Sequence, residues 1–278
     1  MTNPNSAIRN PQSAIGESAI SQYDEGFLQK AITQRMAATG MNTAAAYRQR
    51  LAEDGVEAEV LLASLKITYS EFFRNPLTFA LLEQLILPSR LEANGTTGQA
   101  ELRVWSAGCA AGQEAWSIAI LLEDLAQACG RPIPSRIIAT DISEAALAFA
   151  RQGVYDTAAV QNVRLKHLQK YFIIKGDAYA IIPALKNRVD FSTYDLLDVH
   201  SASPATGIYG DFDLVFCSNL LFYYRMDIRQ QILDKVCRAL APGGFLVTGE
   251  AERDLVAKHD GLRAVAPPAP IFQKRKQF

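Results

Sequence analysis

The chain lacks an excess of charge of either sign. Its 278 residues carry 28 Lys and Arg against 29 Asp and Glu, which leaves a formal net charge of −1. This balance creates no broad field to attract nucleic acid or an anionic membrane. The chain also lacks apolar runs long enough to span a bilayer or to form a signal-peptide core. We therefore expect no nucleic-acid partner, no membrane insertion and a disordered leader over residues 1–22.

Cysteine and histidine are scarce, with 4 and 3 copies respectively. The cysteines lack the spacing of structural metal sites: Cys109, Cys129, Cys217 and Cys237. We expect no metal site, and we expect free thiols in a reducing, cytoplasmic setting.

Hydrophobic residues are plentiful, at 49% of the chain, and after residue 100 they form short runs that alternate with helix-like segments. Strands are expected over 102–106, 136–140, 188–192, 214–217 and 245–248, with a turn at 242–244. Helices are expected over 114–125, 143–152 and 227–240. This alternation predicts an α/β fold with a mostly parallel sheet covered on both faces, where ligands bind beyond the carboxyl ends of the strands.

The preceding region predicts a different organisation. Residues 23–90 are expected to form a small helical domain that Pro88 ends. A polar, Gly-containing linker at 91–99 opens the sheet domain, which we place at 91–278. Apolar runs around Lys175-Gly176-Asp177 predict a β-hairpin within an inserted subdomain of about 160–186.

A loop of small residues follows the first expected strand and contains Gly108 and Gly112. Its Gly-x-x-x-Gly spacing differs from that of dinucleotide sites, and Glu114 adds negative charge where a pyrophosphate would bind. A carboxylate there suits a cationic amino group. Asp141, after the next strand, suits ribose hydroxyls, and Asp195 suits an adenine amine. Together these residues favour S-adenosylmethionine, which leaves S-adenosylhomocysteine as product.

Each of these residues also has a structural interpretation. The loop could reflect tight packing alone, Asp141 could cap the helix that follows it, and Asp195 could lie in an exposed turn.

Five motifs occur in an order that resembles the CheR-type chemotaxis receptor methyltransferases. They are Ser70-Glu71-Phe72-Phe73-Arg74-Asn75-Pro76, the loop from Trp105 to Glu114, Thr140-Asp141-Ile142, residues 216–224 and residues 240–246. The resemblance covers about residues 55 to 275. It implies a helical N-terminal domain, a Rossmann-like methyltransferase domain with a β-subdomain, and transfer of methyl groups to receptor glutamates as methyl esters.

The resemblance also implies roles for individual residues. The implied cofactor contacts are Thr68, Ser70, Arg74, Gly108, Glu114, Asp141, Asp195, Leu196, Ser218 and Asn219. Arg74 and Tyr223 are the implied catalytic residues, with Tyr223 near the transferred methyl. The chain departs from the family pattern where Asn is usual at Thr68 and Asp195, Arg at Ser218, and an acid at Gln113.

The expected partner is the cytoplasmic helical region of a chemoreceptor, bound by a monomer. The tight turn at Gly176 favours an enzyme that does not dock a receptor pentapeptide. A glutamate nucleophile is ionised at neutral pH, so alignment by Arg74 rather than a general base should drive transfer. In a structural interpretation Arg74 pairs with a nearby acid, while Phe72, Phe73 and Tyr223 are core aromatics.

Two alternative functions stay open. One is a methyltransferase for another protein or a small molecule. The other is a cofactor-binding regulator with little or no turnover, which Ser218 in place of arginine would suit.

Overall fold

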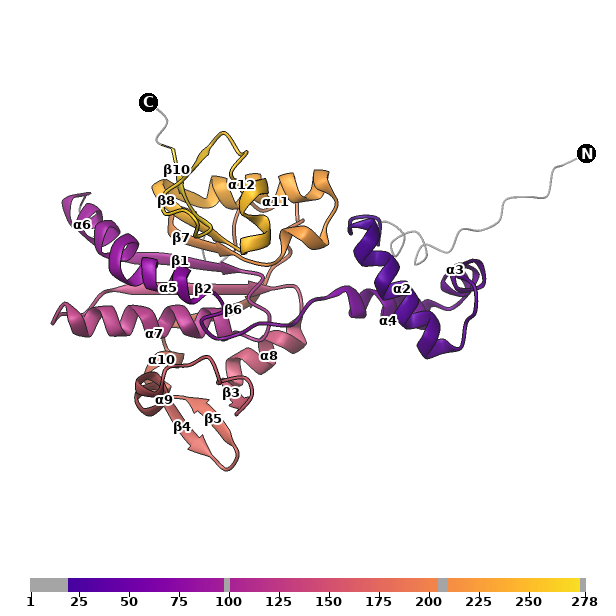
Figure 1. The fold of residues 1–278 in the computed structure, drawn as a ribbon, viewed down its shortest axis with the longest axis horizontal. Helices are drawn as coiled ribbons and strands as arrows, with labels where there is room; N and C mark the ends of the chain where they lie inside the picture. Colours follow the sequence, from indigo (N-terminus) through magenta and orange to yellow (C-terminus); the bar gives the residue numbers. More distant parts are fainter. Residues whose placement is uncertain (1–19, 98–100, 205–209, 276–278) are drawn as a thin grey trace, which may run out of the picture. The chain divides into compact units, whose positions relative to one another are not determined.

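The computed structural model describes residues 20–97, 101–204 and 210–275. They form two compact units (Figure 1). The smaller unit contains the chain up to Ile67 together with Phe222–Arg229, and the larger contains Thr68–Leu221 and the chain from Gln230 onward.

The smaller unit is helical, with α2 (Glu25–Thr39), α3 (Ala44–Glu53) and α4 (Gly55–Leu65). Its helices pack around Tyr47 and Leu61, both fully buried. Glu57 is buried beside them, where its carboxylate accepts hydrogen bonds from the Arg35 guanidinium at 2.8 and 3.0 Å and from the Tyr47 hydroxyl at 2.6 Å. These bonds lower the pKa of Glu57, so a charged group joins the three helices.

The larger unit is built on a seven-stranded sheet in the order β6-β2-β1-β7-β8-β10-β9. Its strands are β1 (Leu102–Ala107), β2 (Ser135–Asp141), β6 (Val189–Thr193), β7 (Phe212–Cys217), β8 (Leu240–Thr248), β9 (Leu262–Ala264) and β10 (Ile271–Lys274). The first five are parallel, and β10 pairs antiparallel with both β8 and β9. The expected α/β fold with a mostly parallel sheet is confirmed.

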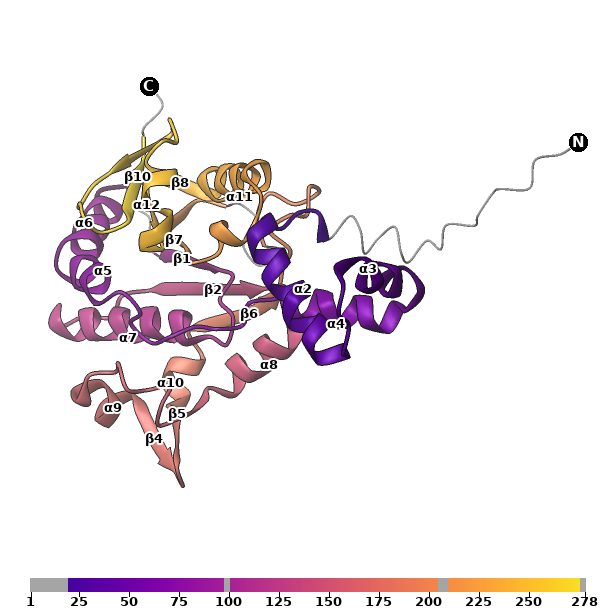
Figure 2. The same ribbon diagram turned by 45° about the vertical axis from the view of Figure 1, so that its right-hand side comes forward.

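Helices cover both faces of this sheet. From β1 the chain crosses to β2 in one direction, and from β7 it crosses to β8 in the other. Right-handed crossovers in opposite directions put their helices on opposite faces. Figures 1 and 2 accordingly show α7 (Gln113–Ala128) and α8 (Glu144–Gln152) below the sheet and α11 (Met226–Ala239) above it.

The segment before β1 belongs to the sheet unit, so the predicted domain boundary at residue 90 is wrong. It contains α5 (Pro76–Leu81), the π-helix η1 (Leu82–Ile86) and α6 (Leu87–Thr97). Phe79 stacks on Phe216 of β7 at 6.0 Å, and Leu82 is fully buried in the same core. The units divide at Ile67 and Thr68 because these apolar contacts join α5 and η1 to the sheet.

Two further expectations about this segment are also wrong. Pro88 does not end the helix, because the π-turn before it shifts the hydrogen-bond register and α6 starts anew at Leu87. Residues 91–97, expected to be a linker, are helical. Of the expected leader, residues 1–19 lie outside the described residues.

The predicted hairpin is confirmed. β4 (Phe172–Lys175) and β5 (Ala178–Ile181) pair antiparallel across Gly176 and Asp177. β3 (Val154–Asp156) adds a third strand, and α9 (Leu165–Tyr171) and α10 (Pro183–Lys186) flank this small sheet.

The turn expected at 242–244 is instead part of β8. The register shifts opposite Phe212 and Leu214, and residues 241–244 form the irregularity. A Cβ at Gly244 would lie 2.8 Å from the Phe212 carbonyl oxygen, so only glycine lets the strand continue past this point.

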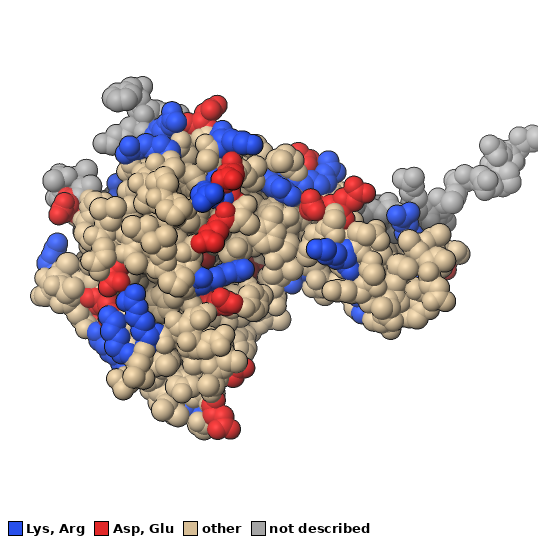
Figure 3. Space-filling model, in the orientation of Figure 1, with Lys and Arg blue, Asp and Glu red and all other residues tan. Residues whose placement is uncertain are grey.

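Acidic and basic residues are mixed on the visible face of the sheet unit, without a large area of one sign (Figure 3). No helix among residues 20–97, 101–204 and 210–275 is long and apolar enough to span a membrane.

We predict that Asp213→Ala destabilises the protein by about 3 kcal/mol. Asp213 is fully buried, pairs with Arg90 of α6 at 2.7 Å and accepts the Arg103 backbone N–H at 2.8 Å. Its loss leaves the mostly buried Arg90 guanidinium, 13% exposed, without this partner. Urea denaturation measures the change, and Asp190→Ala is the control because the Asp190–Arg136 pair is exposed and should contribute less than about 1 kcal/mol. Equal effects of the two substitutions would contradict the prediction.

Candidate active site

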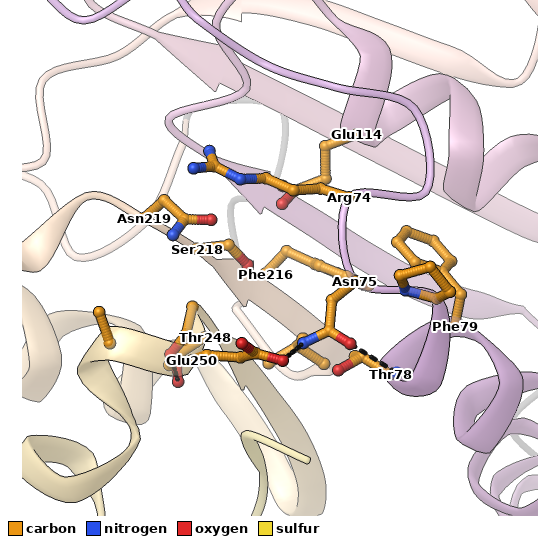
Figure 4. A pocket seen from close by; sticks show the side chains of 14 residues that line it. Arg74, Asn75, Thr78, Phe79, Glu114, Phe216, Ser218, Asn219, Thr248 and Glu250 are labelled. Atoms are coloured by element: carbon orange, nitrogen blue, oxygen red, sulfur yellow. Dashed lines mark hydrogen bonds between the residues drawn. The ribbon is translucent and has the colours of Figure 1, made fainter. Parts of the chain in front are cut away.

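The sheet has its topological switch point between β1 and β7, where the direction of the crossovers reverses. In open α/β sheets such a point leaves a crevice at the carboxyl ends of the strands. Two adjoining pockets of about 330 and 40 Å³ lie here and share the lining residues Arg74, Phe79, Glu114, Ser218 and Asn219. Figure 4 shows the larger pocket.

Six of the ten implied cofactor residues line these pockets. They are Ser70, Arg74, Gly108, Glu114, Ser218 and Asn219. Sequence-distant segments therefore meet where the parallel sheet was expected to bring them. The other four lie outside both linings. Thr68 is exposed just before the motif, Asp141 ends β2, and Asp195 and Leu196 follow β6.

Glu114 is a half-buried acid on the first turn of α7. The Ser106 hydroxyl donates to its Oε1 at 2.7 Å, and the Ser218 side chain also hydrogen bonds to it. Burial raises the pKa of Glu114 to about 7, against the lowering effect of these bonds and of the Arg74 charge. A cationic ligand at this carboxyl would replace the missing solvation and restore its ionised form.

Arg74 is exposed and extends over the pocket toward the side where Asn219 lies (Figure 4). Its guanidinium lies 5.6 Å from the Tyr69 ring centroid, a cation–π contact. Within the described part of the chain it forms no ion pair, and it is the one cation in the two linings. Among the described residues, Arg74 therefore lacks the acid partner that the structural interpretation gave it.

The backbone just before Arg74 adopts an uncommon conformation. Phe73 has φ of 49°, and its N–H donates to the Ser117 hydroxyl of α7 at 3.0 Å. Its buried ring packs edge-to-face on Phe79 at 5.1 Å. Because left-handed backbone at a bulky residue needs support from its surroundings, these contacts fix the direction in which Arg74 leaves the chain. Phe72 and Phe73 are core aromatics, as the structural interpretation held.

The two loop positions are occupied by glycine for different reasons. A Cβ at Gly112 would lie 2.7 Å from Cβ of Ala150 in α8, so close packing of α7 against α8 requires glycine there. Gly108 has φ of 77° and lines the smaller pocket, where it leaves room for a ligand. The packing interpretation therefore applies to Gly112, and cofactor binding by Gly108 stays a prediction.

Asp141 is buried at the end of β2. It accepts the Ala110 N–H at 2.9 Å, which fixes the loop, and the Ser143 N–H at 2.8 Å, just before α8. The expectation that Asp141 caps the following helix is wrong, because Ser143 is the N-cap of α8 and accepts from the Ala146 N–H. Ribose binding by Asp141 stays a prediction.

Asp195 lies in an exposed turn, where its carboxylate accepts the Leu197 N–H at 2.8 Å. This matches the structural interpretation of Asp195. Leu196, beside it, is half-buried. Contact of either residue with adenine stays a prediction.

Tyr223 belongs to the smaller unit. Its ring packs on Phe27 of α2 at 4.8 Å and on Phe222 at 4.2 Å. It therefore has a packing role there, and its proximity to a transferred methyl stays a prediction.

Several pocket residues carried no assignment in the sequence. Asn75 donates to Glu250 at 2.9 Å and caps α5 by accepting from Thr78, as Figure 4 shows. Asn75 lay inside a motif, and the Asn-Pro pair is a helix-start signal that could have revealed it. Glu250 gave no such signal, because only the folding of the chain after β8 brings it to the pocket. The same holds for the buried Glu252, which lies beside the pockets but outside both linings.

The site is a crevice at the switch point of a mostly parallel sheet, with an acid beside it that suits a cationic ligand. These features are typical of α/β enzymes that bind nucleoside cofactors. Residues 68–266 match the family model described as CheR methyltransferase, SAM binding domain. The chain therefore belongs to the CheR methyltransferase family. It is a methyltransferase that depends on S-adenosylmethionine.

A chemotaxis methyltransferase is among the chain's relatives. The chain is 34% identical over 198 residues to chemotaxis protein methyltransferase 1 of Pseudomonas aeruginosa, covering 70% of this chain and 69% of the relative. It is 31% identical over 262 residues to an uncharacterised 104.1 kDa protein of Rhodobacter capsulatus, covering 94% of this chain but 26% of that protein.

Among solved structures, the chain is similar to the N-methyltransferase NodS of Bradyrhizobium japonicum bound to S-adenosyl-L-homocysteine. The TM-score is 0.37 and the identity 18%, over 67% of this chain and 84% of NodS.

We predict that Glu114→Gln stabilises the ligand-free protein at pH 8 by about 2 kcal/mol. Since the pKa of Glu114 is raised from 4.5 to about 7, the folded protein binds more protons than the unfolded chain between these values. Wild-type stability should fall as pH rises through that window, whereas the glutamine variant lacks this loss.

Urea denaturation at pH 5 and pH 8 tests this, with Glu123→Gln on the outer part of α7 as control. A wild-type pH profile that matches that of Glu114→Gln would contradict the burial of an ionisable acid.

Proposed function

We propose that the protein transfers a methyl group from S-adenosylmethionine to glutamate carboxylates on the cytoplasmic helices of a chemoreceptor. The observation that carries the proposal is Arg74, an exposed guanidinium without an acid partner in the described chain, beside the half-buried Glu114. An anionic nucleophile needs such a cation in a lining where acids otherwise predominate.

The lining residues fit this cofactor. Glu114 would hold the cationic amino group of the methionine end of the cofactor, and Gly108 gives space for close approach. Ser218 and Asn219, just after β7, offer polar contacts. Asp141 would hold the ribose from the end of β2. When bound, the cofactor supplies an activated methyl group on a sulfonium.

The chain's own residues would then act by alignment and charge. Arg74 would orient the incoming carboxylate with paired hydrogen bonds from its planar fork. The nucleophile is already ionised at neutral pH, so no residue has to remove a proton. Phe79 and Phe216 make one wall of the larger pocket apolar, which limits water around the reacting groups.

The linings support this substrate over a hydroxyl compound. Neither histidine nor lysine, the bases that would best suit a hydroxyl nucleophile, occurs among the described residues that line the two pockets. The proposal also includes that the protein acts as a monomer. It further includes action without pentapeptide docking, since β4 and β5 are joined by a tight turn at Gly176.

Transfer of labelled methyl groups to chemoreceptor fragments tests the function. We expect the label to be released as methanol by mild alkali, because methyl esters hydrolyse and ethers or N-methyl groups do not. A base-stable product would indicate another substrate class, and cofactor binding without transfer would indicate a regulator.

We predict that Arg74→Ala reduces kcat/KM for methyl transfer by about 100-fold while the Kd for S-adenosylhomocysteine changes by less than about threefold. The cause is loss of carboxylate alignment. The control is Arg136→Ala, which removes an exposed arginine that pairs with Asp190 at 3.0 Å on the sheet's outer strands. Unchanged turnover in Arg74→Ala would show that the assigned role is wrong.

A further inference from the structure

Glu252 is a buried carboxylate next to the site but outside both pocket linings. It is 1% exposed and ends the short 3-10 helix η4 (Glu250–Glu252), which follows β8. Within the described part of the chain it forms no ion pair. An acid buried in this way requires other partners.

Its partners are four backbone N–H groups. Oε2 accepts from Asn219 at 2.9 Å and from Gly249 at 2.7 Å, and Oε1 accepts from Leu220 at 2.7 Å and from Leu221 at 2.6 Å. Burial raises the pKa of Glu252, while these bonds lower it. Three of the four donors are consecutive residues of one loop, so a single side chain fixes that loop.

The loop needs this support because its backbone is uncommon. Asn219 has φ of 58°, in the left-handed region. A Cβ at Gly249 would lie 2.6 Å from Nδ2 of Asn219, so the chain after β8 approaches the loop as closely as glycine permits. Asparagine tolerates this region better than most residues other than glycine, and here the bonds to Glu252 hold the loop in it.

Residues next to these N–H groups also line the site. Ser218 hydrogen bonds to Glu114, and Ser218 and Asn219 line both pockets. The Leu220 side chain packs over Gly108, where an added Cβ would lie 3.4 Å from Cδ2 of Leu220. Movement of this loop would therefore disturb contacts to both the acid and the glycine loop.

We infer that Glu252 is a positioning residue: by binding the N–H groups of residues 219–221 it sets where Ser218 and Asn219 meet the cofactor. It acts through these residues and does not itself line the pockets. The inference rests on the proposed assignment of Ser218 and Asn219 to cofactor binding.

The substitution Glu252→Gln tests it. The side chain keeps its size, but its NH2 group would face two backbone N–H donors and cannot accept a hydrogen bond from either. We expect the Kd for S-adenosylhomocysteine to rise at least about tenfold. Hydrogen–deuterium exchange should accelerate at residues 219–221 and stay unchanged in β1 and β2. Asp254→Asn is the control, since Asp254 is 84% exposed and pairs with its neighbour Arg253.

Glu252→Asp provides a second variant if the glutamine protein does not fold. It keeps the charge but shortens the reach, so the same local pattern should appear. Unchanged affinity in the folded variant would overturn the inference. So would faster exchange throughout the sheet unit in step with the loss of affinity, since that reports general destabilisation.

Ser218→Ala and Asn219→Ala separate this inference from the proposed site. If these variants weaken binding and the Glu252 variants do not, only the positioning role fails. If neither set weakens binding, the cofactor assignment itself is wrong.

Discussion

Partial burial of the Glu114 carboxyl at the switch point is the constraint on which the rest of the site depends. An acid kept from water, with its pKa raised to about 7, costs stability in the free protein. The hydroxyls of Ser106 and Ser218 hydrogen bond to this carboxyl, and the charge of Arg74 lowers its pKa. The site is therefore prepared for a ligand that brings positive charge, and its electrostatics are incomplete without one.

The surrounding fold supports this acid through several uncommon backbone conformations. Phe73, Ala110 and Asn219 all have positive φ, and each lies in or beside a segment that reaches the site. Each has its N–H held by a side chain from elsewhere in the sheet unit: Ser117, Asp141 and Glu252 respectively. The sheet places the three segments, and these side chains hold their backbones in the conformations the site requires.

The sequence predicted the parts that depend on local periodicity and chain order. Strand alternation predicted the parallel sheet, and with it the edge where Gly108 and Asn219 line the pockets. It did not predict that Phe79 and Leu82 pack their helices against the sheet, since an amphipathic pattern does not specify which element it packs on. It also missed Glu252, because its role depends on four backbone donors that only the folded chain brings together.

Calorimetric titration of S-adenosylhomocysteine between about pH 5.5 and about pH 8.5 tests the central claim most directly. If the ligand's cationic amino group binds ionised Glu114, affinity should rise with pH up to about 7, by about tenfold per unit at the acid end, and binding should release a proton there. An affinity that is independent of pH over this range, without proton release, would contradict the account.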